Sequence, residues 1–444
     1  MSAFNGLNAL RHAAVSLTVM DTRNGTILFN QNDEMGLAPA SCLKTVTAAS
    51  AFYMLGTDYH YITTLGYSGS IRNDTLWGDI IIRGSGDPTL GSWRYESCKT
   101  DSILQQWTAA IRQAGIKVIA GQIIGDASVF DTQTTPDGWI WQDMGNYYGA
   151  GPSGLSWHEN QYDLHLHPGH RVGEPVMLNG TEPAVPSLHF INELSTGPAG
   201  SGDHTYIYTA PYGNEAYLRG TAPAGVSSFT ISGSVPDPAL FCAQSLLSAC
   251  HEANIEVTGT ATTRRLWTPD KKVQGSNTEQ VLSEHLSPSF SEICYWFLHK
   301  SINLYGEHLL KTMLLEQHKP VSTANGVEME KRFWQAKGID SGALNIEDGS
   351  GLSPGNRITT KAMASILYKI RQESWFSTYY DCLPDIHNIR MKSGHIGGVC
   401  SYAGYLTTRE GVPVVFSFIV NNYLGSSSVM NEQMWKVLDR MKGR

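Results

Sequence analysis

The chain has 444 residues, of which 41% are hydrophobic, and a formal net charge of −8 at pH 7. This length is enough for more than one domain, and the apolar fraction excludes an intrinsically disordered chain. The negative charge argues against a general nucleic-acid-binding protein, because phosphate backbones attract basic surfaces. No segment approaches the ~20 consecutive apolar residues that span a bilayer, so we expect no transmembrane segment.

The N-terminal part predicts a hairpin followed by a helix. Residues 14–20 and 26–29 are rich in strand formers, and an Asn-Gly pair lies in the connection between them. Residues 46–55 are mostly apolar, and Gly56 follows them directly. This pattern is typical of a helix that ends at a glycine.

The middle of the chain predicts mainly strands. From about residue 62 to 235, short β-rich segments alternate with glycine-rich turns. One amphipathic helix interrupts them over 103–114, and Gly115 ends it. Residues 161–225 contain no long helical pattern and predict a strand-rich insert.

Helices return after residue 236. Asp237-Pro238 and Ser287-Pro288 each place a capping residue before a proline, which is typical of a helix start. The elements predicted after them are a helix over 304–317, strands over 403–407 and 414–420, and a helix over 429–441. Strands near both ends of the chain with helices between them favour an α+β core, whose halves are separated in the sequence by the β-rich middle.

The cysteines and histidines do not predict a metal or another cofactor. Seven cysteines are scattered singly, and we expect most of them to be buried thiols. His165 and His167 share one face of a predicted strand, but no acidic or cysteine partner stands at ligand spacing. The residues after Met1 lack a basic region followed by an apolar run, so we expect no signal peptide in this chain.

A first motif, Ser41-Cys42-Leu43-Lys44, opens a predicted helix. Residues three apart lie on one helix face, so the Lys44 amine can approach the Ser41 hydroxyl, and a desolvated lysine is one known base for a serine nucleophile. The helix N-terminus also supplies N–H groups for a developing oxyanion. Cys42 points about 100° away around the helix, so we expect a buried neighbour and not the nucleophile. Alone, the motif is more often a helix cap followed by a surface lysine.

Two further motifs strengthen the interpretation of the first as a catalytic motif. Ser301-Ile302-Asn303 lies between two predicted helices, and Lys392-Ser393-Gly394 stands before a predicted strand. Glycine lets a substrate backbone come close, and lysine can bind a carboxylate. Each motif occurs by chance, but their order and context together are the signature set of penicillin-binding proteins and serine β-lactamases.

The chain resembles the class C low-molecular-mass penicillin-binding proteins, the D-alanyl-D-alanine carboxypeptidase/endopeptidase family. The stretches that match are 38–41, 84–90, 125–131, 139–144, 285–288, 307–311 and 348–353. The long interval between Lys44 and Ser301 is typical of this family, in which two accessory domains are inserted there. The resemblance implies a β-lactamase/transpeptidase-like catalytic domain with two inserted β-rich domains.

The domain limits that follow from the resemblance are a catalytic domain over 1–63 and 268–444, an inserted domain II over 64–160 and 226–267, and a domain III over 161–225.

The resemblance also implies a role for each matched residue. Ser41 would be the acylated nucleophile, Lys44 its proton acceptor and Ser301 a proton relay to the leaving amine. Asn303 would hydrogen-bond the substrate amide, while Lys392 and Ser393 meet its terminal carboxylate.

Further residues are expected to bind the substrate. The backbone N–H groups of Ser41 and His395 would form the oxyanion hole, with Gly394 between the lysine motif and His395. Asp143, with Tyr148 at the neighbouring aromatic position, would face the free amino end of a diaminopimelate side chain.

Three positions depart from the family pattern. Ile302 stands where a polar residue is usual, His395 where a small hydroxyl residue is common, and Pro354 where many relatives have arginine. His395 would narrow the strand edge, and at Pro354 the arginine that often completes the pocket for the peptide side chain is missing. None of the three removes a reacting group.

The sequence therefore predicts a serine D-alanyl-D-alanine carboxypeptidase or endopeptidase that acts on peptidoglycan peptides and is acylated by penicillins. The resemblance implies a periplasmic or other extracytoplasmic location, with the leader absent from this chain. The alternatives are a β-lactamase or SxxK-type esterase, which would deacylate penicillin quickly, and a catalytically silent wall-binding scaffold. The long insertion argues against the first two, and the intact motifs argue against the third.

Overall fold

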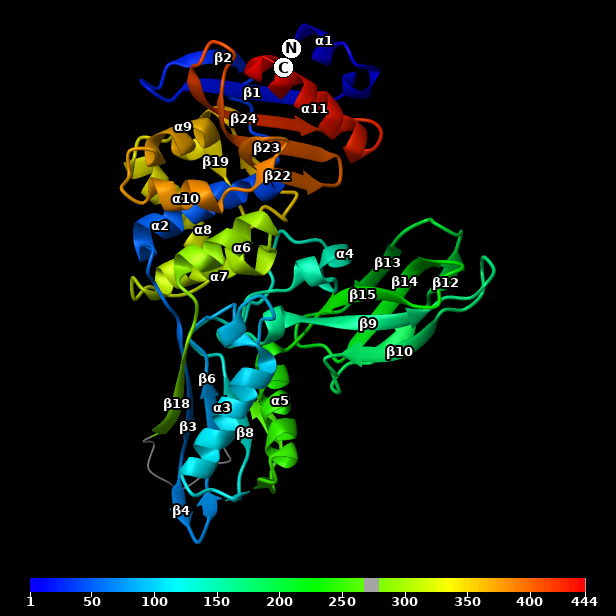
Figure 1. The fold of residues 1–444 in the computed structure, drawn as a ribbon, viewed down its shortest axis with the longest axis vertical. Helices are drawn as coiled ribbons and strands as arrows, with labels where there is room; N and C mark the ends of the chain where they lie inside the picture. The colour runs from blue at the N-terminus through cyan, green and yellow to red at the C-terminus, as the bar shows by residue number, and fades with distance from the viewer. Residues whose placement is uncertain (267–278, 444) are drawn as a thin grey trace. The chain divides into compact units, whose positions relative to one another are not determined.

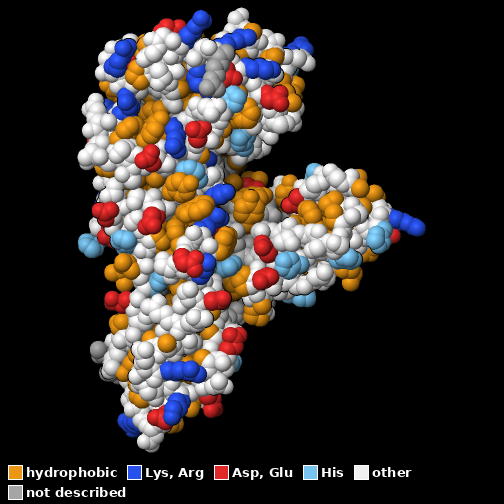
Figure 2. Space-filling model, in the orientation of Figure 1, with side chains coloured by type: hydrophobic (Ala, Val, Ile, Leu, Met, Phe, Trp, Pro, Cys, Tyr) orange, Lys and Arg blue, Asp and Glu red, His pale blue; other side chains and the backbone are white. Residues whose placement is uncertain are grey.

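The computed structural model describes residues 1–266 and 279–443, which form two compact units (Figure 1). Unit 1 consists of Met1–Tyr59, Pro136–Gly138 and Ser289–Arg444, and unit 2 of His60–Thr135 and Trp139–Pro288. Acidic and basic side chains are interspersed on the face shown in Figure 2. Within the described ranges, no helix has both the length and the apolar character that a membrane crossing requires.

Unit 1 is built on an antiparallel six-stranded sheet with the order β2-β1-β24-β23-β22-β21. Its strands are β1 (Ala14–Asp21), β2 (Ile27–Gln31), β21 (Asp385–Ile386), β22 (Ile389–Ile396), β23 (Val399–Thr407) and β24 (Pro413–Asn421). The predicted N-terminal hairpin and the two predicted C-terminal strands are confirmed. β1 pairs directly with β24, so the two ends of the chain form the centre of one sheet.

The two faces of this sheet are covered by different helices (Figure 1). Leu17 of β1 and Phe418 of β24 share an apolar core with Met434 of helix α11 (Ser427–Lys442). On the opposite face, Ser16 and Thr18 hydrogen-bond the hydroxyl of Thr360, the first residue of helix α9 (Thr360–Ile370), at 2.6 and 2.8 Å. Successive side chains of a strand point to opposite faces, so β1 contacts α11 on one face of the sheet and α9 on the other.

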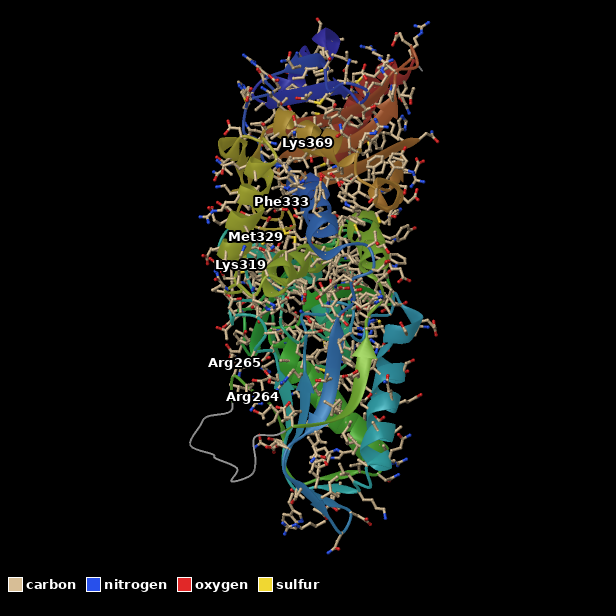
Figure 3. The ribbon with its side chains drawn as sticks, turned by 90° about the vertical axis from the view of Figure 1, so that its left-hand side faces the viewer. Arg264, Arg265, Lys319, Met329, Phe333 and Lys369 are labelled. Atoms are coloured by element: carbon tan, nitrogen blue, oxygen red, sulfur yellow. The ribbon has the colours of Figure 1, made fainter. Side chains whose placement is uncertain are left out.

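Other helices of unit 1 enclose α2 (Lys44–Leu55), of which the residues from Lys44 to Phe52 are buried. These helices are α6 (Phe290–His299), α7 (Asn303–Leu315), α8 (Thr323–Ala336), α9 (Thr360–Ile370) and α10 (Phe376–Cys382). Unit 1 also contains the short α1 (Ser2–Asn5), which packs with α11, and the strands β19 (Leu344–Asn345) and β20 (Arg357–Ile358). Phe52 packs on the Phe290 ring at 4.7 Å between centroids. Met329 and Phe333 mark the course of α8 in Figure 3. The predicted apolar helix is therefore an enclosed central helix.

One predicted helix start is wrong. We predicted that Ser287-Pro288 opens a helix, but α6 begins at Phe290 and its cap is Ser289, which forms a reciprocal capping box with Glu292. Ser287 instead accepts the N–H of Tyr61 at 2.9 Å. A capping box satisfies two N–H groups at a helix start, whereas proline at the first position supplies only a suitable φ.

Unit 2 combines several small sheets with two long helices. Its first sheets have the orders β17-β8-β6-β3-β18 and β16-β7-β5-β4, and α3 (Thr100–Gln113) and α5 (Pro238–Glu252) accompany them. The strands are β3 (Ile62–Tyr67), β4 (Ser70–Arg72), β5 (Thr75–Trp77), β6 (Ile80–Arg83), β7 (Val118–Ile119), β8 (Ile123–Asp126), β16 (Glu256–Val257), β17 (Ala261–Thr263) and β18 (Gln280–Leu286). The helix start at Asp237 is confirmed, since its side chain accepts the N–H of Leu240 at 3.1 Å.

The strand-rich insert is also confirmed. It contains two further sheets, β10-β9-β15 and β11-β14-β12 with β13 beside β14. These strands are β9 (Gln161–His167), β10 (Met177–Glu182), β11 (His189–Asn192), β12 (Ser195–Gly197), β13 (His204–Tyr208), β14 (Glu215–Pro223) and β15 (Phe229–Ser234). One apolar core runs from Leu65 to Ile255 through both parts of unit 2. The division into domains II and III stays a prediction, and its limit at 267/268 lies outside the described residues.

All seven cysteines are buried, as predicted for most of them. The two strand histidines make local contacts: His165 Nδ1 lies 3.1 Å from the Thr230 hydroxyl, and His167 Nδ1 lies 2.6 Å from the carbonyl oxygen of Ser227. Nowhere in 1–266 or 279–443 do three or more His, Cys, Asp or Glu side chains gather as a metal would require.

Candidate active site

The first motif brings a serine and a lysine into contact inside unit 1. Ser41 lies in a 3₁₀ turn, Ala40–Leu43, and Lys44 is the first residue of α2. The Lys44 Nζ lies 2.9 Å from the Ser41 Oγ. The sequence predicted that both residues lie on one face of an α-helix, whereas in the structure Ser41 lies in a 3₁₀ turn and Lys44 begins the α-helix. Their side chains are close in either case, because three residues span about one turn of both helix types.

Two carbonyl oxygens orient the lysine amine. Lys44 Nζ donates to the side-chain oxygen of Asn303 and to the backbone oxygen of Ser350, both at 2.6 Å. Carbonyl oxygens only accept hydrogen bonds, so these contacts use both N–H groups of a neutral amine. The remaining lone pair of the amine then faces the Ser41 hydroxyl, which can donate to it.

The surroundings of Lys44 favour this neutral form. Its side chain is completely buried. Burial is the main cause that holds the pKa of Lys44 well below its ordinary value, and the charge of Lys392 adds to it. The carboxyl groups of Asp348 and Glu307 act in the opposite direction but do not reverse it. Because a lowered pKa favours the neutral amine, this lysine is suited to accept a proton.

The second motif lies between α6 and α7. Asn303 is the first residue of α7 and reaches Lys44, while Ser301 has a left-handed backbone with φ of 56°. In the described part of the chain, Asn303 but not Ser301 makes a hydrogen bond to Lys44. A non-glycine residue at positive φ costs roughly 1–3 kcal/mol and persists where the surrounding structure holds it, often at functional sites. Ile302, which departs from the family pattern, is buried beside it.

The third motif lies on β22, which has an accessible edge. β21 pairs with β22 only at Ile389 and Arg390, so among the described residues no strand covers the edge from Lys392 onward. Lys392 is 2% exposed, and burial lowers its pKa to about 8. Its Nζ donates to the backbone oxygen of Ser393 at 2.6 Å.

Glycine at position 394 allows β22 to lie against the turn that carries Ser41. A Cβ atom on Gly394 would stand 2.6 Å from the backbone oxygen of Pro39 and 2.8 Å from the backbone nitrogen of Cys42. Both distances are shorter than van der Waals contact, so no other residue fits there without a shift. The Cys42 thiol adds a second link, since it donates to the backbone oxygen of Lys392 at 3.2 Å.

Two further side chains of the motif stretches, those of Cys42 and His395, make contacts of their own. Cys42 is completely buried, and burial raises the pKa of its thiol to about 11, so it is no thiolate nucleophile at neutral pH. This agrees with the prediction. The exposed His395 ring turns toward α11, where Nε2 lies 2.9 Å from the Asn431 side-chain oxygen.

Sequence analysis predicted no role for the loop that presents Ser350 to Lys44. Asp348 accepts the N–H groups of Gly351 and Ser353, each at 2.7 Å. Glu307 accepts the N–H of Gly349, and burial together with the charge of Asp348 raises its pKa to about 8. The stretch 348–353 matched the family pattern, but no local signal told which of its atoms faces the lysine.

Asp143 and Tyr148 belong to unit 2. Asp143 lies in the short helix α4 (Trp141–Met144), and Tyr148 in the 3₁₀ turn Tyr147–Gly149. Burial raises the pKa of Asp143, and its hydrogen bond to Tyr148 opposes this. The two residues thus form a partly buried pair, and their contact with a peptide stays a prediction.

Comparison with known proteins identifies the family. Residues 3–385 match the D-Ala-D-Ala carboxypeptidase 3 (S13) family. The chain belongs to this family. The D-alanyl-D-alanine carboxypeptidase DacB of Haemophilus influenzae is 25% identical over 429 residues, which cover 92% of this chain and 85% of the relative. The D-alanyl-D-alanine carboxypeptidase of Actinomadura is 26% identical over 450 residues, which cover 94% and 79%.

Solved structures show the same fold. Penicillin-binding protein 4 (dacB) from Haemophilus influenzae superimposes with a TM-score of 0.79 at 23% identity, covering 96% of this chain and 94% of that one. The predatory peptidoglycan endopeptidase Bd3459 of Bdellovibrio bacteriovorus gives 0.51 at 12% identity, covering 97% and 93%. The predicted resemblance, the α+β fold class and the enzyme class of a serine-type D-Ala-D-Ala carboxypeptidase are confirmed.

Proposed function

We propose that the chain cleaves the terminal D-alanyl-D-alanine bond of peptidoglycan peptides through an acyl-enzyme on Ser41. The observation that carries this proposal is the contact between a buried Lys44 amine and the Ser41 hydroxyl, at 2.9 Å, within the three-motif site of this family. The Ser41 oxygen attacks the penultimate carbonyl carbon, and the Lys44 amine takes the hydroxyl proton. D-alanine then leaves with a proton, and water later hydrolyses the ester and restores Ser41.

The open edge of β22 supports a defined substrate pose. An extended peptide can add to this edge through main-chain hydrogen bonds, beside the turn that carries Ser41. The N–H groups of Ser41 and His395 would receive the developing oxyanion. The carboxylate of the last D-alanine would meet Lys392 and the Ser393 hydroxyl, since a lysine with a pKa of about 8 is mostly cationic at neutral pH.

The leaving amine would take its proton from Lys44 through the hydroxyl of Ser301. When that amine belongs to a second peptide instead of free D-alanine, the same steps open a cross-link, so endopeptidase activity is a variant of one mechanism. The proposed place of action is outside the cytoplasm, where the wall lies. Penicillin imitates the D-alanyl-D-alanine end, and penicillin-binding protein 4 from Haemophilus influenzae was solved with a bound β-lactam.

Intact-mass spectrometry with excess penicillin tests the proposal. We expect one stable penicillin adduct that maps to Ser41 and is absent from Ser41→Ala. No mass increase, or the same increase in Ser41→Ala, would overturn the assignment of the nucleophile. An adduct that disappears within seconds would favour a β-lactamase, and a stable adduct without cleavage of a D-alanyl-D-alanine peptide would favour the silent scaffold.

A further inference from the structure

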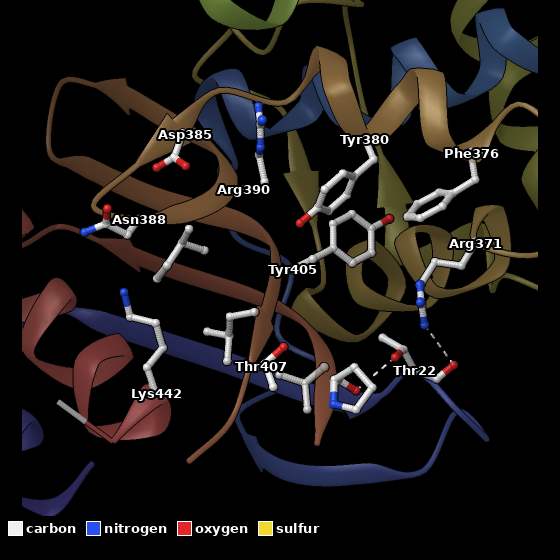
Figure 4. Close-up of a pocket in the computed structure, with 14 residues that line it drawn as sticks. Thr22, Arg371, Phe376, Tyr380, Asp385, Asn388, Arg390, Tyr405, Thr407 and Lys442 are labelled. Atoms are coloured by element: carbon white, nitrogen blue, oxygen red, sulfur yellow. Dashed lines mark hydrogen bonds between the residues drawn. The ribbon is translucent and has the colours of Figure 1, made fainter. Parts of the chain in front are cut away.

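A cavity of unit 1 is lined by none of the motif residues. It has a volume of about 700 Å³ and lies where the loop after α9, the β21–β22 turn, β23 and the end of α11 meet (Figure 4). The residues that give it its chemical character are Arg371, Phe376, Tyr380, Arg390, Tyr405 and Lys442. Arg390 and Lys392 are alternate residues of β22, so this cavity and the active site adjoin the same strand.

The cavity carries cationic groups with unused donors. Arg371 donates through Nη1 to the backbone oxygen of Thr22 at 3.2 Å, and Arg390 donates through Nη1 to that of Leu383 at 2.9 Å. Within the described residues, neither guanidinium forms an ion pair. A guanidinium has five N–H donors in a planar fork that fits a carboxylate, so each arginine retains most of its capacity. In a chain of net charge −8, this local excess of positive charge is distinctive.

Aromatic rings hold these arginines in place. The Tyr405 ring lies 5.4 Å from Phe376 and 5.7 Å from Tyr380, measured between centroids. The Arg371 guanidinium stands 5.6 Å from the centre of the Phe376 ring, and that of Arg390 5.9 Å from Tyr380. The Tyr405 hydroxyl is fixed by a 2.8 Å hydrogen bond to the backbone oxygen of Leu367. This wall of the cavity is therefore preorganised, with aromatic ring faces beside guanidinium groups that can bind an anion.

The side of the cavity away from Arg371 carries charges of both signs. Asp385, the cross-strand neighbour of Arg390, lies there with Asn388 and Lys442 (Figure 4). The Lys442 amine already donates to the backbone oxygen of His387 at 2.9 Å and stands 3.7 Å from Asp439. A dense polyanion would be repelled by Asp385, whereas a ligand with both acidic and N–H or O–H groups would find partners on both sides.

We propose that this cavity is a second binding site for a carboxylate-bearing sugar–peptide chain. One carboxylate of the chain would bind Arg371 and a second would bind Arg390, its sugar face would pack on the tyrosine rings between them, and its amide or hydroxyl groups would donate to Asp385. This ligand rests on the proposed function, because such chains are the polymer that the active site would trim. The site would hold the polymer without taking part in the bond cleavage.

Calorimetric titration with a soluble, uncross-linked disaccharide–tetrapeptide tests this site on the penicillin-acylated protein, in which Ser41 is blocked. We expect saturable binding with one site per chain, weakened at least about tenfold in Arg371→Gln and in Arg390→Gln. Arg332→Gln is the matched control, since that arginine lies on α8 and pairs with the exposed Glu328 at 2.6 Å. Its affinity should equal that of the unchanged protein.

Several outcomes would overturn the site. These are no binding by the acylated protein, equal affinity in all three variants, or stronger competition by inorganic phosphate than by the peptide without its sugars. Each variant is first checked for an unchanged melting temperature and for penicillin acylation, and Arg390→Lys replaces Arg390→Gln if the latter unfolds. Failure of acylation would contradict the proposed function. Titration of the unacylated variants would still show whether the cavity binds the disaccharide–tetrapeptide.

Discussion

The amine of Lys44 lies 2.6 Å from the side-chain oxygen of Asn303, although 259 positions separate the two residues in the chain. This hydrogen bond joins the first motif to the second and fixes the direction of the amine. Since Ser350 takes the other N–H through its backbone oxygen at 2.6 Å, the lone pair is directed toward Ser41. The proposed base is therefore oriented by residues outside its own motif.

Replacement of the base gives the first prediction. Lys44→Arg keeps a cation, but guanidinium does not lose its proton in proteins, so penicillin acylation should fall by ~10²-fold or more. The second-order rate constant of acylation by stopped-flow fluorescence measures this. Lys361→Arg, an exposed lysine paired with Glu34, is the control and should leave the rate unchanged. A near-normal rate in Lys44→Arg would place the base elsewhere.

The orienting amide gives the second prediction. Asn303→Asp places a carboxylate beside the Lys44 amine and favours its ammonium form, which raises the pKa of Lys44. Acylation at pH 7 should then fall about tenfold or more, and the limb of the rate profile that reports on the base should move to higher pH. Rates measured from pH 6 to about 10 reveal the shift. An equal loss at every pH would mean that Asn303 positions the substrate and not the amine.

Lys392 gives a prediction on stability. Burial lowers its pKa to about 8, whereas an unfolded chain keeps the usual value near 10.5, so the unfolded state binds the proton more tightly. By linkage, this lysine lowers the free energy of unfolding below pH 8. That free energy is recovered as the pH rises from about 8 to 10.5. Lys392→Met should therefore gain up to roughly 3 kcal/mol at pH 7 and much less near pH 10.

Urea denaturation of both proteins at the two pH values measures this difference. Lys392→Met should at the same time lose affinity for a peptide that ends in a carboxylate. A gain in stability that is the same at both pH values would show that the side-chain packing, and not the proton, causes it.

The approach of β22 to the serine turn gives a fourth prediction. Gly394→Ala would place a Cβ atom 2.6 Å from the backbone oxygen of Pro39 and separate the strand from the turn. We expect acylation to fall more than about tenfold, because an active-site displacement of one ångström can cost that much. Gly397→Ala is the control, since a Cβ atom there meets nothing within 4 Å. Equal rates in the two variants would contradict the close packing.

Asp143 gives the fifth prediction. Asp143→Asn should lower kcat/KM for peptides with a free side-chain amino end by ~10–100-fold, because a charge-assisted hydrogen bond is lost. Penicillin acylation, which involves no such amine, should hardly change. Tyr148→Phe removes the hydrogen bond that holds down the pKa of Asp143, so its effect should be greater at low pH. Equal losses on both substrates, with a lower melting temperature, would make Asp143 a structural residue.

Local features were readable from the sequence. The spacing of Ser41 and Lys44 places them on one turn of a helix. An apolar run ended by a glycine predicted the central helix, and runs of strand-forming residues predicted the strands near both ends. The start of α6 was misplaced although Ser289 and Glu292 stand at the spacing of a capping box. Two reciprocal hydrogen bonds stabilise that start, and the proline signal one residue earlier drew the prediction away from it.

Only the tertiary structure decided how the motifs work together. Burial of Lys44 depends on the helices that enclose α2, and its low pKa follows from that burial. The contact of Gly394 with Cys42 joins segments that are far apart in the chain. The cavity that contains Arg371 and Arg390 is likewise lined by residues from several different elements. The amino-acid sequence alone determined which reactive side chains are present, and therefore which reactions are possible. The desolvation and the orientation of these side chains depend on neighbours that the fold brings from far away in the sequence.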